Sequence, residues 1–513
     1  MRLGIDFGTT RTVVAVALEG RVGLASFDVD GEFRDYLPGL MVWHKRRASF
    51  GWDAVAALEE DPQHILRSIK RLAAQAGPDG VAFSADGAEW TALDLISDYL
   101  SYVRTMLVER SNLSLSAGEP LEAFIAVPAN ANTQQRYLTM EAFRRAGFRV
   151  LRMLNEPTAA AIEFASRHKT ALSDRSPKRY VVIYDLGGGT FDTSAISLEG
   201  RRFELLASEG ISALGGDDFD EVILDMALEQ LGLRIEDLAA HTRHRLLEVC
   251  REAKETLKPT SRKVLVDVSL WLSGAQPLVL DAPEVFARCE RLVNRTVHLI
   301  QQVFSNLESH GIDASNLREL GALYLVGGAA AFPSVGRVLR SMYKRKIQLA
   351  MQPHAATAVG LAVASDPQAN LLIREASTRL FGVWREQTFG KLKHFDQLLG
   401  KDSEPDSLGQ VVAQRRYVAH HNIGHLRFVE CTAIDPQGEP AGDLIPWHDV
   451  YFPYDAELAQ HPRLEEAEIR RSAEGFAEIE ETYVYRADGV IDVTITNLSH
   501  GYERRYSLTP RQD

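Results

Sequence analysis

The stretch that most constrains the fold of this chain runs from Tyr180 to Leu198, YVVIYDLGGGTFDTSAISL. An apolar, β-branched run leads into three consecutive glycines, and a second apolar run follows them. Short apolar runs bracketed by glycines predict a hairpin of two buried strands. Three successive glycines weaken a hairpin, so they are expected only where something must lie against the bare backbone. The pattern therefore predicts a ligand-binding turn.

The acids beside this turn indicate the ligand. Unobstructed N–H groups of successive residues form a concave anion site that suits a phosphate. Asp185 and Asp192 flank the glycines, and each close carboxylate–phosphate pair would cost roughly 4 kcal/mol at an effective dielectric constant near 20. A divalent cation removes this repulsion, so the stretch predicts a nucleotide bound with Mg²⁺. The alternative is an ordinary glycine-rich turn, which needs one or two glycines and no flanking acids.

The start of the chain repeats this pattern. Residues 3–18, LGIDFGTTRTVVAVAL, run from an apolar strand through Asp6 to a glycine–threonine turn and a second β-branched strand. Set beside 181–198, this is an internal repeat at a spacing of roughly 180 residues. Two such hairpins predict two α/β lobes that face each other across a cleft and hold a phosphate from both sides.

Two further glycine turns open predicted helices. They are Leu214-Gly215-Gly216-Asp217 and Val326-Gly327-Gly328-Ala329. The N-terminus of a helix offers free N–H groups and the favourable end of the dipole to an anion. Both turns are therefore candidate contacts to the nucleotide.

Periodicity and capping residues predict the remaining elements. Helices are expected near 64–76, 91–110 with Thr91 as N-cap, 132–146, 241–258 and, as two helices, 283–310. Strands are expected at 123–127, 148–154 and near 263–272. Beyond residue 380, short alternating stretches predict a mainly antiparallel β-domain, in which only 463–472 suggests a helix.

Composition excludes several classes of function. The apolar fraction of 45% and charged fraction of 25% are those of an ordinary globular protein. A net charge of −13 argues against a nucleic-acid-binding face. The three cysteines match no metal spacing and suit a reducing compartment. With no run of 18 apolar residues and a first strand that leaves no room for a leader, the cytoplasm is the expected location, with no membrane partner.

Five motifs together resemble the DnaK-type, seventy-kilodalton heat-shock chaperones of the actin and sugar-kinase ATPase superfamily. They are GIDFGTT, NEPTAAA, DLGGGTFD, LGGDDFD and LVGG, which occur in the family's order and at similar spacings. The resemblance is strong over about 1–365 and rests mainly on 487–508 in the β-domain.

The resemblance implies a domain organisation. A two-lobed, actin-like α/β ATPase domain is expected over 1–365, with lobes of roughly 1–178 and 179–365. An interdomain linker would follow at 366–380, and a mainly antiparallel β-sandwich domain that binds peptides at 381–513. The helical lid that follows this domain in the family is not expected here.

The resemblance also implies roles for single residues. Asp6, Asp185 and Asp192 fall where family acids hold the metal and its water shell, the last two also counting as catalytic. Lys70 matches the catalytic lysine that stabilises charge on the transferred phosphoryl group, and Glu156 matches the acid near the attacking water. Without the resemblance, Lys70 would be interpreted as a solvated helix lysine and Glu156 as an acid at a helix start. Nucleotide contacts are implied at Gly8, Thr9, Thr10, Gly187, Gly188, Gly189, Thr190, Gly215, Gly216, Lys254, Gly327, Gly328 and Ala329.

Cofactors and partners follow from the same resemblance. ATP or ADP with Mg²⁺ is expected, with K⁺ as a further candidate ion. Unfolded or extended polypeptide is the expected partner, together with a nucleotide exchange factor and a J-domain cochaperone, which Arg152 would engage. Pro128 and Arg136 match a relay between the nucleotide site and the peptide-binding domain.

The chain departs from the family pattern near the nucleotide base and in the linker. Ala330 and Ala331 replace a threonine–arginine pair whose arginine packs on adenine. Arg251 and Glu255 reverse the usual order of charges, and His354 replaces an acid. ATP is still expected, with reduced affinity or altered base discrimination. Arg374 interrupts a linker that the family keeps apolar, which predicts weaker coupling.

The favoured hypothesis is a slow ATPase that acts as an atypical, lidless chaperone. The alternative is a nucleotide-gated adaptor or scaffold whose β-domain binds one dedicated partner. A small-molecule kinase on the same fold is poorly supported, because sugar kinases place a different acid as general base and lack the DLGGGTFD form.

Overall fold

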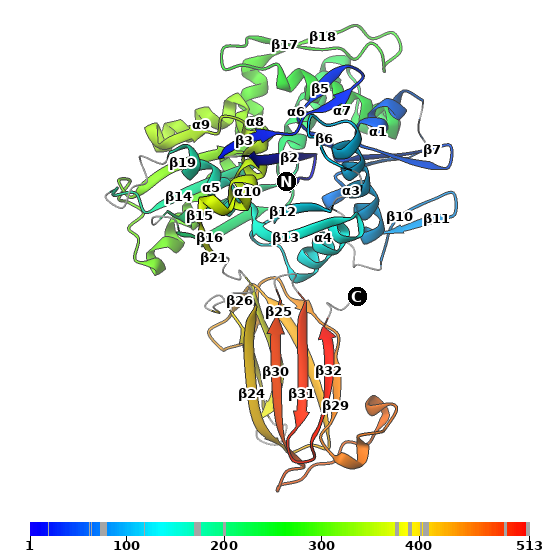
Figure 1. Ribbon diagram of the computed structural model, residues 1–513. Coiled ribbons are helices and arrows are strands. Elements are labelled where there is room, and N and C mark those ends of the chain that lie inside the picture. The colour runs from blue at the N-terminus through cyan, green and yellow to red at the C-terminus, as the bar shows by residue number, and fades with distance from the viewer. Residues whose placement is uncertain are drawn as a thin grey trace. The chain divides into compact units, whose positions relative to one another are not determined.

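A computed structural model describes the chain except for residues 19, 61, 63, 72–79, 117, 119, 169–175, 199–201, 375–378, 388–391, 401–402, 404–409, 487–489 and 509–513 (Figure 1). The chain forms two compact units. Unit 1 comprises Met1–Ala129 and Ala142–Glu375, and unit 2 comprises Asn130–Glu141 and Ala376–Asp513. No helix in the described part of the chain is long and apolar enough to cross a membrane.

Unit 1 is built on two six-stranded sheets. The first has the order β13 (Phe148–Asn155), β12 (Leu121–Val127), β1 (Arg2–Phe7), β2 (Arg11–Leu18) and β3 (Arg21–Leu24), with β6 (Leu37–Pro38) on β2. The second has the order β20 (Ile347–Leu349), β19 (Leu320–Val326), β14 (Tyr180–Leu186), β15 (Phe191–Ser197), β16 (Arg202–Ile211) and β21 (Leu372–Arg374).

The two sheets repeat one arrangement. In each, an antiparallel hairpin pairs in parallel with the next strand, β1–β2 with β12 and β14–β15 with β19. The central strands are almost continuously apolar because both of their faces are covered. The internal repeat in the sequence is therefore also a repeat of topology.

Helices surround these sheets (Figure 1). They are α1 (Gly51–Ala57), α3 (Ala92–Glu109), α5 (Glu156–Arg167), α6 (Gly216–Leu231), α7 (Ala240–Glu255), α8 (Ala282–Asn306), α9 (Pro333–Tyr343) and α10 (Ala356–Ser365). The side chain and backbone of Thr91 form a capping box with Asp94 at the start of α3, as predicted.

Small residues let α10 lie close to its neighbours. A Cβ atom on Gly360 would lie 1.7 Å from the carbonyl oxygen of Ala159 in α5, and one on Gly4 would lie 2.5 Å from that of Ala358. No side chain fits at either position. This contact fixes α5, which begins at Glu156, against the strand that ends at Asp6 and Phe7.

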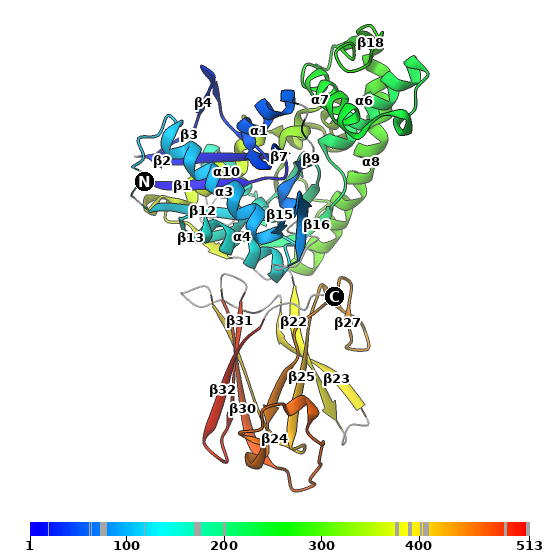
Figure 2. The same ribbon diagram turned by 90° about the vertical axis from the view of Figure 1, so that its right-hand side faces the viewer.

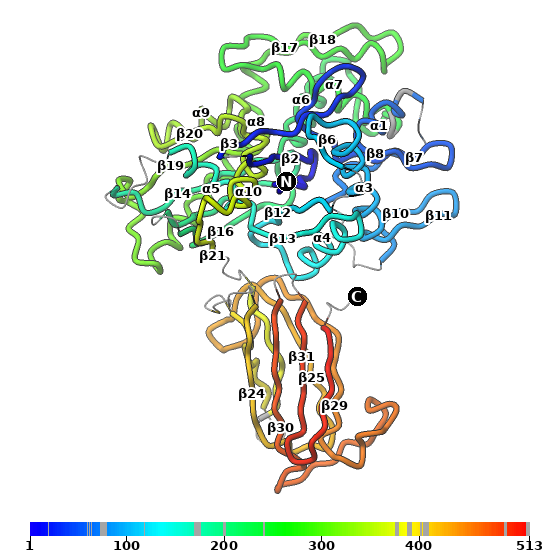
Figure 3. Tube along the Cα trace, in the orientation of Figure 1, coloured from blue at the N-terminus to red at the C-terminus, as the bar shows by residue number. Residues whose placement is uncertain are grey.

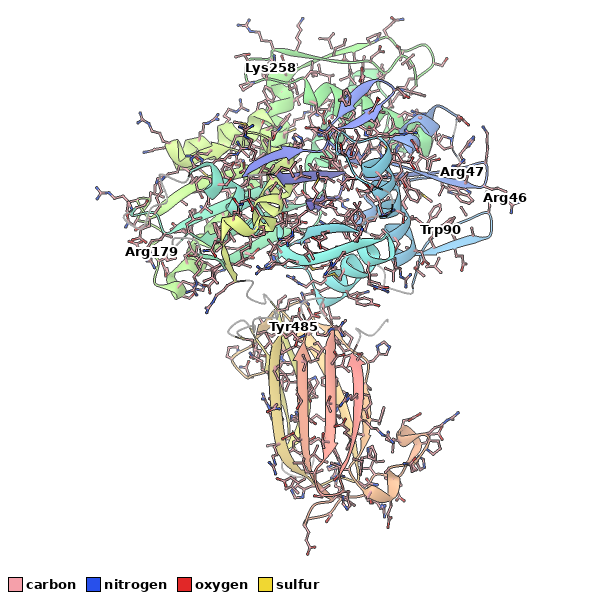
Figure 4. All side chains as sticks on the ribbon, in the orientation of Figure 1. Arg46, Arg47, Trp90, Arg179, Lys258 and Tyr485 are labelled. Carbon is pink, nitrogen blue, oxygen red and sulfur yellow. The ribbon has the colours of Figure 1, made fainter. Side chains whose placement is uncertain are left out.

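Three predicted elements are wrong in type or extent. Residues 64–67 form strand β9 (His64–Arg67), which pairs with β7 (Leu40–His44). Arg46 lies in the turn after β7, and Arg47 begins the next strand, β8 (Arg47–Phe50) (Figure 4). A helical turn carries Lys70, and 72–79 lie outside the described residues. The two helices expected over 283–310 are one helix, α8, followed by a 3₁₀ turn, and the strand near 263–272 ends at Val266.

Residues 366–374 of the expected linker belong to unit 1, and residues 379–380 belong to unit 2. Strand β21 pairs in parallel with β16, so that Leu372, Ile373 and Arg374 lie opposite Arg202, Phe203 and Glu204. Ile373 is buried while its two neighbours are exposed. The Arg374 side chain is exposed, so its charge adds no cost of burial.

Unit 2 contains two antiparallel sheets that share one core (Figure 2). The first joins β23 (Leu392–Leu399), β22 (Leu380–Gln387), β25 (Ile423–Cys431), β28 (Ile445–Pro446) and β29 (Val450–Pro453). The second joins β24 (Val411–Ala419), β30 (Ala477–Tyr485), β31 (Ile491–Asn497) and β32 (Tyr502–Leu508), and these strands run side by side in Figure 3. The helix expected over 463–472 is wrong, since only a 3₁₀ turn at Leu464–Glu466 occurs there.

Candidate nucleotide-binding site

The turns of the two repeated hairpins meet inside unit 1. A Cβ atom on Gly188 would lie 2.2 Å from Cγ2 of Thr10, so the central turn has room for Thr10 only because residue 188 is glycine. Gly8 and Gly187 each donate their N–H across their own turn, to the carbonyls of Arg11 and Thr190. The two glycine turns therefore form one continuous backbone surface.

The two later glycine turns join the same surface. A Cβ atom on Gly215 would lie 2.5 Å from the backbone of Gly188, and one on Gly327 would lie 2.5 Å from Oδ1 of Asp185. A Cβ atom on Gly216 would lie 3.2 Å from the Ala329 side chain. All four predicted turns therefore converge on one place.

The N-terminus of α6 does not offer the free N–H groups that its sequence predicts. The N–H of Gly216 donates to the Gly187 carbonyl at 2.9 Å, and that of Asp217 donates to the Gly188 carbonyl at 2.7 Å. The N–H of Gly215 donates to the Asp218 carboxylate at 2.7 Å. These donors hold the central turn in place, so Gly215 and Gly216 support this turn from behind.

A buried cluster of acids surrounds Lys70 next to these turns. Asp185 and Asp192 lie directly opposite each other on β14 and β15. Lys70 Nζ lies 2.5 Å from Oε1 of Glu156, and both side chains are largely buried, at 13% and 15% exposure. Asp6, at the end of β1, interacts electrostatically with both members of this ion pair. One ammonium group thus faces four carboxylates.

The charge imbalance shifts the pKa values of the cluster. Burial, reinforced by the charge of Glu156, raises the pKa of Asp6 to about 7 and that of Asp192 to about 7. Burial and the neighbouring acids raise the pKa of Asp185 well above its usual range. Burial alone would lower the pKa of Lys70, but the charges of Glu156 and Asp6 outweigh it and the pKa rises. Excess negative charge in a dry site calls for a cation.

The three aspartates fit Mg²⁺ held through water. Carboxylate oxygens are the ligands that Mg²⁺ prefers, and this ion usually keeps several of its waters. Among the described residues, no group of three or more His, Cys, Asp and Glu side chains converges closely enough to hold a metal ion directly. The arrangement therefore suits a hydrated ion that also contacts a phosphate.

Lys254 links α7 to the glycine turns. Its Nζ donates to the Gly216 carbonyl at 2.7 Å and lies 2.7 Å from Oδ1 of Asp220. Arg251, one of the two residues at which the order of charges differs from the family, pairs with Asp217 on α6 at 2.9 Å. It therefore joins α7 to α6 beside the glycine turns. His354 lies 2.9 Å from Asp35.

Three arginines that the sequence reasoning missed lie beside the turns. Arg71 Nη2 donates to the Gly189 carbonyl at 2.5 Å. Arg11 lies 2.6 Å from Glu255 and over the Tyr36 ring. Arg67 pairs with Glu248 on α7. Only Arg11 and Arg71 carried a signal in the sequence, because they adjoin Thr10 and Lys70.

Arg152, expected to engage a J-domain cochaperone, and Arg136, expected to act in the relay, both make local contacts. Arg152 Nη2 donates to the Ile373 carbonyl of β21 at 2.9 Å, so it holds the linker strand within unit 1. Arg136, on α4 (Thr133–Arg145), donates from Nε to the Ala131 carbonyl at 3.3 Å.

Two matching sheets whose hairpin turns meet at a cluster of acids define a two-lobed α/β protein of the actin-like ATPase class. A sequence model of the Hsp70 protein family matches residues 2–371. The chain belongs to the Hsp70 family.

Chaperones of bacteria are similar to this chain. It is 32% identical over 380 residues to the chaperone protein HscA homolog of Pseudomonas aeruginosa, which covers 71% of this chain and 58% of the relative. It is 30% identical over 407 residues to the HscA homolog of Tolumonas auensis, covering 76% and 62%. With HscA of Serratia proteamaculans the identity is 32% over 381 residues, covering 71% and 57%. The chain thus spans less than two thirds of the length of these relatives.

Proposed function

We propose that this protein is an ATP-dependent molecular chaperone. Unit 1 binds and slowly hydrolyses ATP with Mg²⁺, and the nucleotide state controls how unit 2 holds an extended polypeptide. The observation that carries the proposal is the buried excess of carboxylates around Lys70, placed where the glycine turns of both repeats meet. The relatives named chaperone protein HscA support the same function.

The site residues divide the work of hydrolysis between them. Asp6, Asp185 and Asp192 would hold the waters of Mg²⁺, which neutralises charge on the phosphates when it is bound. Lys70 donates to the transferred phosphoryl group, and Glu156 fixes the direction of the Lys70 ammonium and lies where an attacking water can be oriented.

The glycine turns supply the phosphate cradle. In this proposal Gly8, Thr9, Thr10, Gly187, Gly188, Gly189 and Thr190 contact the phosphates, while Gly215, Gly216, Lys254, Gly327, Gly328 and Ala329 line the wall towards the nucleoside. Arg71 adds a guanidinium at the Gly189 carbonyl. K⁺ remains a further candidate ion beside the phosphates.

Domain roles follow from this assignment. Residues 1–365 would be the ATPase domain, 366–380 the linker and 381–513 a β-sandwich that binds peptide. A J-domain cochaperone and a nucleotide exchange factor are the proposed regulators, and the contact of Arg152 with the linker strand suits a cochaperone site that senses linker position. Three buried cysteine thiols suit the reducing cytoplasm.

A dedicated-partner adaptor is the second candidate function. The relatives named chaperone protein HscA favour the chaperone over this alternative. Peptide-array binding separates the two functions, since broad recognition of apolar heptamers supports the chaperone and a blank array supports the adaptor.

ATP turnover tests the enzyme assignment. We expect phosphate release by the parent protein with Mg²⁺, and a loss of at least about 100-fold in Lys70→Ala with nucleotide binding retained, because the lysine acts on charge that develops during transfer. Equal turnover by mutant and parent would refute the assigned role. Stimulation by a J-domain protein and an unfolded peptide would support the coupling.

A further inference from the structure

We propose that residues 468–472 of unit 2, here called the strap, occupy a backbone-pairing site that an extended basic polypeptide takes by displacing them. The inference rests on the proposed peptide-binding function of unit 2 and names the surface and the class of ligand.

The strap pairs as an antiparallel strand with the turn between β24 and β25. His421 and Arg471 face each other in an isolated antiparallel bridge. The N–H of Asn422 donates to the Arg470 carbonyl at 3.1 Å, and the N–H of Ser472 donates to the His420 carbonyl at 3.0 Å. This is the hydrogen-bond pattern by which an added strand binds a sheet edge.

The side chain of Asn422 bonds to backbone groups of the strap. Its Nδ2 donates to the Glu468 carbonyl at 2.9 Å, and its Oδ1 accepts from the Arg470 N–H at 2.7 Å. Asn422 is 1% exposed. A buried amide that loses both partners is destabilising, so another extended chain with a carbonyl and an N–H at the same spacing can take the place of the strap.

Side chains anchor the strap only weakly. Glu468, Ile469, Arg470 and Arg471 are exposed, and Ile469, the one large apolar residue, is 64% exposed. The nearest buried side chain before the strap is Leu464 and the nearest after it is Ala477. A segment held by a few backbone hydrogen bonds and exposed ion pairs, without buried apolar contacts of its own, opens at low free energy.

The charges beside the strap define the ligand. Arg470 lies 2.9 Å from Asp455, and Arg471 lies 3.8 Å from Glu386, which also lies 3.4 Å from His421. Adjacent residues of a strand point in opposite directions, so each arginine reaches a different carboxylate. An extended peptide with two adjacent basic residues reproduces both pairs. The negative net charge of the chain, −13, favours its approach.

A reversible lock tests the displacement. The double variant His421→Cys with Arg471→Cys places two thiols at facing positions. Oxidation joins them in a disulfide, which holds the strap in its place. The probe is a labelled peptide with the sequence of residues 467–473, AEIRRSA. We expect the reduced variant to bind it and the oxidised variant to bind at least tenfold more weakly, with recovery on reduction. The matched control, Arg416→Cys with Glu480→Cys, bridges facing residues of β24 and β30 and should bind equally in both states.

The outcomes separate the strap from the function on which it rests. Equal binding by the oxidised and reduced lock would overturn the displacement, and equal binding of a probe with both arginines changed to glutamate would overturn the basic specificity. A parent protein that binds no array peptide at all would instead refute peptide binding by unit 2. Hydrogen exchange of the parent gives a second readout, because the probe should speed exchange at the Arg470 and Ser472 amides, and an unchanged rate would also overturn the displacement.

Discussion

The charged side chains that surround the buried Glu481 in unit 2 balance one another, whereas those buried around Lys70 in unit 1 do not. In unit 2, Arg385 lies 2.7 Å from Asp396 and 2.5 Å from Glu481, and Arg415 lies 2.9 Å from Asp396. Two guanidinium groups therefore meet two carboxylates. The hydroxyls of Tyr417 and Tyr483 also donate to Glu481.

This difference in charge balance distinguishes a structural network from a ligand-binding site. A charge-balanced, fully hydrogen-bonded network specifies how a core packs and needs no ligand. Four carboxylates around one ammonium group stay buried only at a loss of stability, which a bound cation recovers. Neutralising one acid should therefore have opposite effects in the two units.

The largest effect is expected from Glu481→Ala. It leaves the Arg385 guanidinium buried without its main partner, which should destabilise unit 2 by about 3–5 kcal/mol. Hydrogen exchange followed through β30 and β31 measures this change. Exchange rates equal to those of the parent would show that the network is not a structural element.

A smaller effect of opposite sign is expected from Asp192→Asn. The amide keeps the shape but removes a buried charge whose pKa is raised to about 7, so ligand-free unit 1 should become more stable. The same variant should lose most of its affinity for Mg²⁺ with ATP. Urea unfolding without nucleotide measures the gain, and a loss of stability would contradict the imbalance.

A fall in pH should remove the stability that His244, on α7, contributes to unit 1. Burial, with the neighbouring Arg67 charge, lowers the pKa of His244 to about 3, and Arg67 Nε lies 2.8 Å from its Nε2. The unfolded chain takes up a proton near pH 6.5 and the folded chain does not, so the contribution of His244 to stability is full above pH 6.5 and falls below it. The loss should reach about 1–2 kcal/mol by pH 5. His244→Gln should flatten this slope, and an unchanged slope would exclude the histidine as its source.

The smallest effect is expected on the outer face of unit 2. Arg416 lies 2.8 Å from Glu478, but both side chains are exposed. Exposed pairs contribute little because water screens them. Arg416→Ala should leave the thermal midpoint unchanged, and a clear drop would show that ion pairs matter in unit 2 whether or not they are buried.

The sequence could predict the parts of the site that depend on local backbone chemistry. Three glycines beside two acids, and a similar strand, acid and glycine–threonine turn near the N-terminus, were sufficient to infer two hairpins, whose turns meet in the structure. Arg67 was missed because its partner, Glu248, is distant in sequence and only the fold brings the two together. No local pattern records such pairs.

Two errors in the fold have the same cause. His64–Arg67 has helical periodicity, yet its pairing with β7 makes it a strand. Residues 463–472 also have a helical pattern of charges, but the backbone groups of Arg470 and Ser472 bond to the turn at 420–422 instead. In both cases a long-range partner outweighs the local preference.

Calorimetry of ATP binding tests the central claim most directly, namely that the unbalanced acids of unit 1 are completed by a magnesium nucleotide. We predict one binding event per chain when ATP is titrated with Mg²⁺, and a large loss of affinity when a chelator removes the metal. Identical heats with and without Mg²⁺, or no heat at millimolar ATP, would contradict the account.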